Sequence, residues 1–84
     1  MNRLGFIILS ILHKEGAMDK FSSMTVREIA SEEELGMKEN TIYKKLKNFE
    51  QSGYIGRGLK EGRADTFYIT SEGCECLERE KNEK

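Results

Sequence analysis

Five polar side chains recur at helical spacing in the middle of the chain, and together they could bind a nucleic acid. In the stretch KENTIYKKLKNFEQ, residues 38–51, apolar side chains fall on one face of a helix and polar ones on the other. Amide, hydroxyl, phenol and ammonium groups suit phosphates and base edges, and no carboxylate interrupts this outer face. An ordinary amphipathic helix with a solvated, lysine-rich face is the alternative. The candidate contact residues are Asn40, Thr41, Tyr43, Lys44 and Lys47.

The other reactive side chains do not assemble a catalytic or metal site. Cys74 and Cys76 are two residues apart, so on a helix they point in different directions, and a zinc site needs about four suitably spaced ligands. His13 is isolated, and the glycines at 56–62 lack the lysine and hydroxyl residue of a nucleotide-binding loop. We therefore expect no enzyme activity, metal or cofactor. A redox role for the cysteines is a minor alternative.

Size and charge are compatible with one small nucleic-acid-binding domain spanning residues 1–84. Hydrophobic residues make up 37% and charged residues 35%, the composition of a globular protein. The net charge of −1 argues at first against nucleic acid. The distribution reverses this conclusion, because residues 38–65 hold seven basic and four acidic side chains. The central segment is a local basic patch on an acidic body.

The apolar run from Leu4 to Leu12 predicts a soluble helix and no membrane span. It is interrupted by Gly5 and Ser10, is too short to cross a bilayer, and has no signal-peptide cleavage site. We expect a cytoplasmic protein with reduced thiols.

Apolar periodicity and turn residues predict three helices followed by a hairpin. The second helix should start with a capping box, Thr25 to Glu28, and Gly53 should end the third. The final short helix, capped by Thr70 or Ser71, should turn Cys74 and Leu77 inward and fray from residue 78. Ser23 or Met24 could add a third strand. The expected segments are a helix near 2–15, a helix from 25, a helix at 39–51, strands at 54–59 and 66–70, and a charged hairpin tip at 60–63.

The first helix is apolar on two sides, which suggests a second partner for its outer stripe. Phe6 and Leu9, flanking His13, form that stripe. We interpret it as a homodimer contact. The alternative is that the chain's own C-terminal segment covers it.

Three stretches, TVREIA, LGMKENTIYKKLKNFEQSGYI and GRADTFYITSEGCECL, resemble winged helix-turn-helix transcriptional regulators of the MarR and PadR type. The resemblance covers about two thirds of the chain. It implies an α+β, mostly helical fold with three helices, a two- or three-stranded wing and a short C-terminal helix. It also implies that the helix at 39–51 enters the DNA major groove and that the wing, residues 55–68, lies on the backbone or minor groove.

Carried over by position, the resemblance assigns DNA contacts to the five helix residues above and to the wing residues Arg57, Lys60 and Arg63. Two features depart from the family pattern. Lys38 replaces the usual serine or threonine helix cap, and the stretch from Ala30 to Leu35 is about two residues longer than usual.

The sequence thus predicts sequence-specific binding of double-stranded DNA by a small, dimeric transcriptional regulator without an evident small-molecule ligand. A winged-helix protein-interaction module, or a replication or mobile-element accessory factor, is the alternative.

Overall fold

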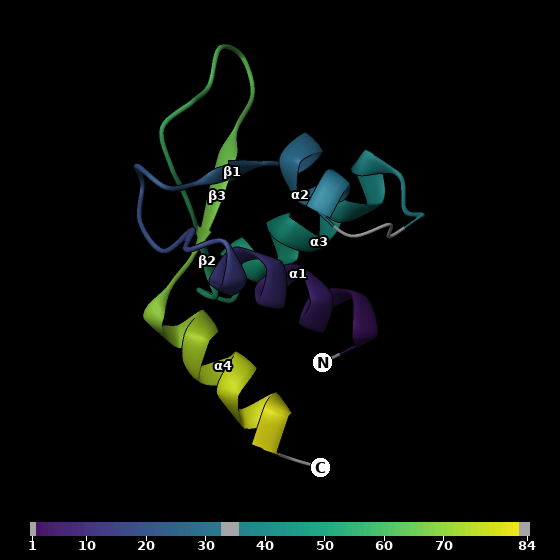
Figure 1. Cartoon of the computed structure of the whole chain (residues 1–84), viewed down its shortest axis with the longest axis vertical. Coiled ribbons are helices and arrows are strands. Elements are labelled where there is room, and N and C mark those ends of the chain that lie inside the picture. Colours follow the sequence, from purple (N-terminus) through teal and green to yellow (C-terminus); the bar gives the residue numbers. More distant parts are fainter. Residues whose placement is uncertain (1, 33–35, 83–84) are drawn as a thin grey trace.

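In a computed structural model that describes residues 2–32 and 36–82, four helices lie beside and below a three-stranded antiparallel sheet in the view of Figure 1. This arrangement confirms the predicted α+β fold. Both ends of the chain lie on the side of the molecule opposite the long hairpin. In chain order the elements are α1 (Arg3–Lys14), β1 (Met24–Thr25), α2 (Val26–Glu32), α3 (Glu39–Gln51), β2 (Ile55–Arg57), β3 (Thr66–Ile69) and α4 (Ser71–Asn82).

The capping box predicted for α2 is present. The backbone N–H of Thr25 donates to Glu28 Oε1 at 2.8 Å, and the backbone N–H of Glu28 donates to Thr25 Oγ1 at 3.1 Å. These reciprocal bonds satisfy two N–H groups that a helix start would otherwise leave unpaired. They fix α2 directly after β1, so the sheet sets where the helix-turn-helix begins.

The start and end of α3 also follow the local sequence. Gly36, in the turn before α3, and Gly53, after its end, have φ values of +64° and +83°, a backbone region that glycine tolerates at little cost. Lys38 makes no side-chain capping bond, as its residue type predicted. Residues 33–35, part of the stretch from Ala30 to Leu35 that was predicted to be longer than usual, lie outside the described residues.

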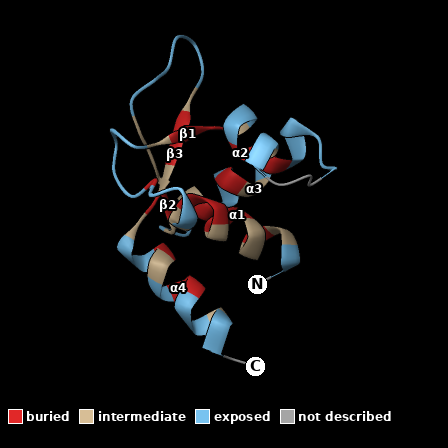
Figure 2. Cartoon of the chain, viewed as in Figure 1, coloured by how far each residue is buried: buried red, intermediate tan, exposed pale blue. Residues whose placement is uncertain are grey.

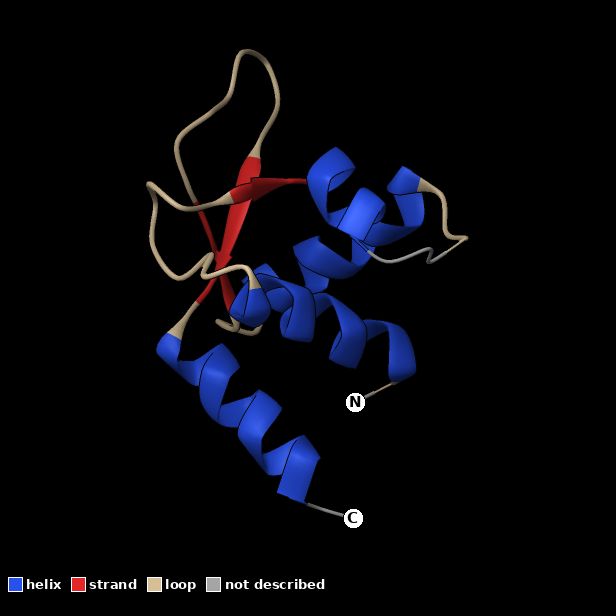
Figure 3. Cartoon of the chain, in the orientation of Figure 1, coloured by secondary structure: helices blue, strands red, loops and turns tan. Residues whose placement is uncertain are grey.

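The strand order is β1-β3-β2, so the predicted third strand exists and β3 is central. Met24 is opposite Phe67 on one side of β3, and Arg57 is opposite Phe67 on the other. The first wing strand is shorter than predicted because the hairpin widens after Gly58, whose N–H still donates to the Thr66 carbonyl. The tip closes again through paired backbone hydrogen bonds between Glu61 and Ala64. Figure 3 shows this hairpin as a loop extending away from the helices.

Fully buried side chains from α1, α2, α3 and β3 meet in one core. Figure 2 shows this core where α1 and α3 lie against the sheet, with the hairpin tip and the outer turns exposed. Because α3 contributes three apolar side chains to the core, its opposite face is left for solvent or a partner. The core side chains with no exposed surface include Ile8, Leu12, Ile29, Ile42, Leu46 and Phe67.

The last helix is longer than the short helix that the sequence predicted. It continues to Asn82, so residues 78–82 belong to it, and residues 83–84 lie outside the described part. The hydroxyl of Thr70 caps it by accepting from the Gly73 N–H at 3.1 Å. Arg79 and Lys81 in its last turn complement the negative end of the helix dipole. The cysteine prediction was wrong in one respect, since Cys76 is the more buried thiol.

Candidate nucleic-acid interface

The outer face of α3 presents a continuous set of polar side chains. Asn40, Thr41, Lys44 and Lys47 are all exposed, while Ile42, Leu46 and Phe49 on the opposite face are buried. Within the described part of the chain, neither Lys44 nor Lys47 forms an ion pair. This face therefore offers amide, hydroxyl and ammonium groups that no carboxylate of the described residues pairs with.

Tyr43 lies at the border of that face and is partly occupied by the fold. Its ring makes an edge-on contact with Phe67, with 6.2 Å between ring centroids. Lys47 Nζ lies 5.9 Å from the centre of the Tyr43 ring. The aromatic ring thus anchors α3 to β3 and orients Lys47, so Tyr43 is less available to a ligand than the sequence predicted.

The start of α3 has no side-chain cap, so its first backbone N–H groups keep their partial positive charge without a capping side chain. Lys38 has an extended backbone, and its carbonyl accepts from the N–H groups of Thr41 and Ile42. No side chain of Lys38 occupies the first N–H groups of α3. Glu39 is near Arg27, with Oε2 3.9 Å from Nε, and both side chains are largely exposed, so this pair contributes little. Helix starts of this kind favour anions.

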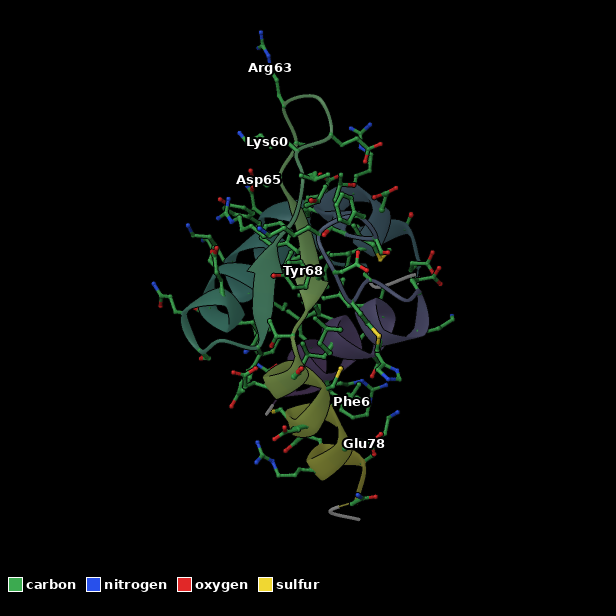
Figure 4. All side chains as sticks on the ribbon, turned by 90° about the vertical axis from the view of Figure 1, so that its left-hand side faces the viewer. Phe6, Lys60, Arg63, Asp65, Tyr68 and Glu78 are labelled. Atoms are coloured by element: carbon green, nitrogen blue, oxygen red, sulfur yellow. The ribbon has the colours of Figure 1, made fainter. Side chains whose placement is uncertain are left out.

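The wing carries two basic side chains beyond the body of the molecule. Figure 4 shows Arg63 pointing away from the tip of the hairpin and Lys60 lying below it. Lys60 Nζ is 3.7 Å from Asp65 Oδ1, and the Lys60 side chain is 66% exposed. In the described residues Arg63 has no ion-pair partner. Both cations can therefore reach a surface that lies alongside α3.

Arg57 is held differently from the other predicted contact residues. Its Nε donates to Glu50 Oε2 at 3.0 Å, its Nη2 to Glu50 Oε1 at 3.3 Å, and its Nη1 to Asp65 Oδ2 at 2.8 Å. The guanidinium also lies 5.2 Å from the centre of the Phe67 ring. Hydrogen bonding to Glu50 raises the pKa of Arg57 above its usual value, although burial acts in the opposite direction. The structure thus directs Arg57 to carboxylates of the protein.

The sequence reasoning missed Glu50 and Asp65 as members of this site. Each is separated from Arg57 by a turn, seven residues before it and eight after it. The sequence signal that could have found them is an acidic residue on each side of the short strand that carries Arg57. That signal becomes specific only when the turn at Gly53 and the hairpin pairing are known.

The predicted dimer stripe is only partly exposed. Leu9 has no exposed surface, so the interpretation that Leu9 meets a partner was wrong, and for this residue the alternative of cover by the chain itself holds. The last helix, α4, packs against α1. Phe6 and His13 are half-buried. In Figure 4, Phe6 and Glu78 lie at the end of the molecule opposite the wing.

A groove of about 560 Å³ separates the wing from α2 and the start of α3. Its lining includes Glu28, Glu39, Tyr43, Glu61 and Asp65. No group of side chains in residues 2–32 and 36–82 has the composition of a metal site. Within the same ranges, no helix is long and apolar enough to cross a membrane.

Comparison with known proteins gives one relative of nearly equal length. No family model matches the chain. Over 77 residues the chain is 30% identical to the DNA-binding protein TubR of a Clostridium botulinum C phage, a match that covers 92% of this chain and 93% of that protein. TubR from Bacillus megaterium pBM400 has a similar structure, with a TM-score of 0.82 and 22% identity, covering 98% of this chain and 88% of that one.

Longer regulators share the same fold. The MepR protein of Staphylococcus aureus, solved as a complex with DNA, has a TM-score of 0.76 at 19% identity, covering 96% of this chain and 62% of that one. A MarR-family regulator from Rhodococcus sp. RHA1 has a TM-score of 0.78 at 17% identity, covering 96% of this chain and 53% of that one. These likenesses confirm the winged-helix fold predicted from the sequence.

Proposed function

The chain belongs to the TubR family of DNA-binding proteins, and on that basis we propose that it is a small, sequence-specific regulator that binds double-stranded DNA. The observation that carries the proposal is the outer face of α3, where four exposed polar side chains lie together and form no ion pair with another described residue. A family of DNA-binding proteins and a free polar helix face beside a basic wing support the same activity.

In the proposed complex, α3 lies in the major groove and the wing lies along the neighbouring backbone or minor groove. Asn40 and Thr41, near the start of α3, read base edges, because the start of a recognition helix is the part that reaches deepest. Lys44 and Lys47 neutralise phosphates, and Tyr43 adds its hydroxyl from the border of the face. Lys60 and Arg63 extend these phosphate contacts along the wing.

Selection of bound duplexes from random DNA tests this function. Wild-type protein should enrich a consensus sequence, and Asn40→Ala should enrich it poorly while retaining binding to random DNA. Lys81→Gln, which changes an exposed lysine of α4, serves as the matched surface control and should enrich the wild-type consensus. Failure of the wild-type protein to enrich any sequence, or to bind duplex DNA at all, would contradict the proposal.

We further propose that the chain binds as a homodimer through the N-terminal half of α1. Leu4, Phe6 and Ile7 pack against the core but are only partly buried, so they leave apolar surface exposed near the N-terminus. Two copies would combine the few contacts that one small module makes, and a two-fold dimer predicts an inverted repeat in the selected DNA.

Sedimentation equilibrium tests the dimer with a matched pair of variants. Phe6→Lys should give a monomer, because it places a charge in the proposed interface. Phe21→Lys changes a side chain that is 86% exposed in the loop before β1 and should leave the dimer intact. If the dimer persists in Phe6→Lys and dissociates in Phe21→Lys, the proposed interface is wrong and the loop before β1 forms the interface.

A protein-interaction module is the second candidate, and two exposed apolar side chains favour it. Phe21 is 86% exposed and Leu59 is 55% exposed. The loop and the wing base that carry them are joined by a hydrogen bond from the Leu59 N–H to the Lys20 carbonyl. Salt dependence separates the candidates, because affinity for DNA falls steeply with salt and affinity at an apolar interface does not.

A further inference from the structure

Arg57 connects the recognition helix to the wing through hydrogen bonds on both sides. Glu50 on α3 receives two of them and Asp65, at the end of the hairpin, receives the third. We propose that Arg57 is a positioning residue that sets the angle between the wing and α3, and that it does not itself contact DNA. This inference rests on the proposed DNA binding and assigns a different role to a residue predicted to touch DNA.

Three of the five N–H donors of Arg57 are already used by carboxylates of the protein. Its three side-chain nitrogens each donate one of these bonds, and its guanidinium carbon lies 5.2 Å from the centre of the Phe67 ring. A phosphate would have to share the guanidinium through its two remaining N–H groups, or displace charge-assisted bonds that are about twice as strong as neutral ones. Two carboxylates also compensate its single positive charge, so Arg57 presents little net attraction to DNA.

The wing has few other connections to the helices. In the described ranges, every side-chain hydrogen bond between α3 and the hairpin includes Arg57. The groove lies between the hairpin tip, with Glu61 and Ala64, and the start of α3. Side-chain packing therefore does not hold the tip against the start of α3. Beside the contact of the Tyr43 ring with Phe67, the link from Glu50 through Arg57 to Asp65 therefore holds the hairpin relative to α3.

This link also positions a proposed phosphate contact. Asp65 accepts from Arg57 through Oδ2 and lies 3.7 Å from Lys60 Nζ through Oδ1. The position of Asp65, set by Arg57, thus determines where the Lys60 ammonium stands beside the DNA.

Substitution of Glu50 distinguishes a positioning role of Arg57 from a direct DNA contact, because the two roles predict opposite changes in DNA affinity. Glu50→Met removes a negative charge beside the DNA and frees Arg57 while keeping a good helix former. If Arg57 bound phosphate, this variant would bind DNA more tightly. If Arg57 positions the wing, the variant should bind about tenfold more weakly, the size of effect typical of one charge-assisted hydrogen bond.

The matched control is Glu39→Met, which removes the same charge from the same helix without touching the Arg57 link. It should bind DNA as tightly as the wild type or more tightly. Arg57→Lys provides a second variant that keeps the positive charge, and it should weaken binding because one ammonium cannot replace the forked hydrogen bonds. Wild-type or tighter affinity of either Glu50→Met or Arg57→Lys would overturn the proposal.

A second measurement does not depend on DNA. In Glu50→Met the backbone order parameters of residues 60–64 should fall toward about 0.6, the flexible range, while those of β3 stay high. Should the wild-type chain fail to bind DNA, the proposed function fails, and the order parameters still decide the positioning role. Unchanged order parameters at the hairpin tip would overturn it.

Discussion

The salt dependence of DNA binding follows from the four phosphate contacts proposed for α3 and the wing. Lys44, Lys47, Lys60 and Arg63 are exposed, whereas Arg57 is compensated by two carboxylates. Each neutralised phosphate contributes a slope of about 0.9 to the dependence of log affinity on log salt. A rise from about 50 to 200 mM salt therefore weakens binding about 3.5-fold for each contact, and about 150-fold for four contacts in one protomer.

Lys44→Gln removes one of these contacts and should reduce that loss to about 40-fold for each protomer bound. Lys47→Gln should have the same effect, because its ammonium is also exposed on α3. Both variants should weaken binding to specific and random duplexes equally, since phosphates carry no sequence information. In a dimer each substitution removes two phosphate contacts, so its effect on the slope is doubled.

Fluorescence anisotropy of a labelled duplex at several salt concentrations measures these slopes. Lys81→Gln, on the exposed surface of α4, is the control and should retain the wild-type slope. The reasoning is refuted if both α3 variants keep the full slope, or if Lys81→Gln lowers it as much as they do.

Three further predictions concern specificity, packing and thiol chemistry. Asn40→Ala should narrow the affinity gap between the selected sequence and random DNA by about 1 to 3 kcal/mol, as competition binding would show, and an unchanged gap would exclude a base contact. Gly73→Ala should lower the free energy of unfolding in denaturant titrations although alanine favours helices, because the new methyl group would meet the backbone carbonyl of Tyr54. The control Glu75→Ala, on the exposed side of α4, should be nearly neutral, and equal stability of the two variants would contradict this packing. Burial raises the pKa of the Cys74 thiol, so a smaller fraction of it is thiolate near pH 8. Iodoacetamide should therefore modify Cys74 more slowly in the folded protein than in the unfolded chain. Faster labelling in the folded state would disprove this prediction.

Local sequence was sufficient to place most helix ends. The capping box from Thr25 to Glu28 acts over four adjacent residues, and Gly53 ends α3 through its own backbone freedom. The apolar spacing of Ile42, Leu46 and Phe49 likewise determines which face of α3 is buried. These features depend on neighbours in the chain, so pattern reasoning recovers them without a structure.

The tertiary structure gives contacts within the chain to two residues that the sequence analysis assigned to a partner. Arg57 was predicted to face DNA, but the turn at Gly53 and the hairpin bring Glu50 and Asp65 to its guanidinium from opposite directions along the chain. Leu9 was predicted to face a partner, with cover by the C-terminal segment as the alternative; it has no exposed surface, and α4 packs against α1.

The sequence by itself therefore determined the elements, their order and the polar face of α3. Only the tertiary structure decided which charged and apolar side chains remain available to a partner. The physical reason is that the exposure of a side chain depends on contacts between segments distant in the sequence. The spacing of residue types along the chain does not specify which of these segments pack together.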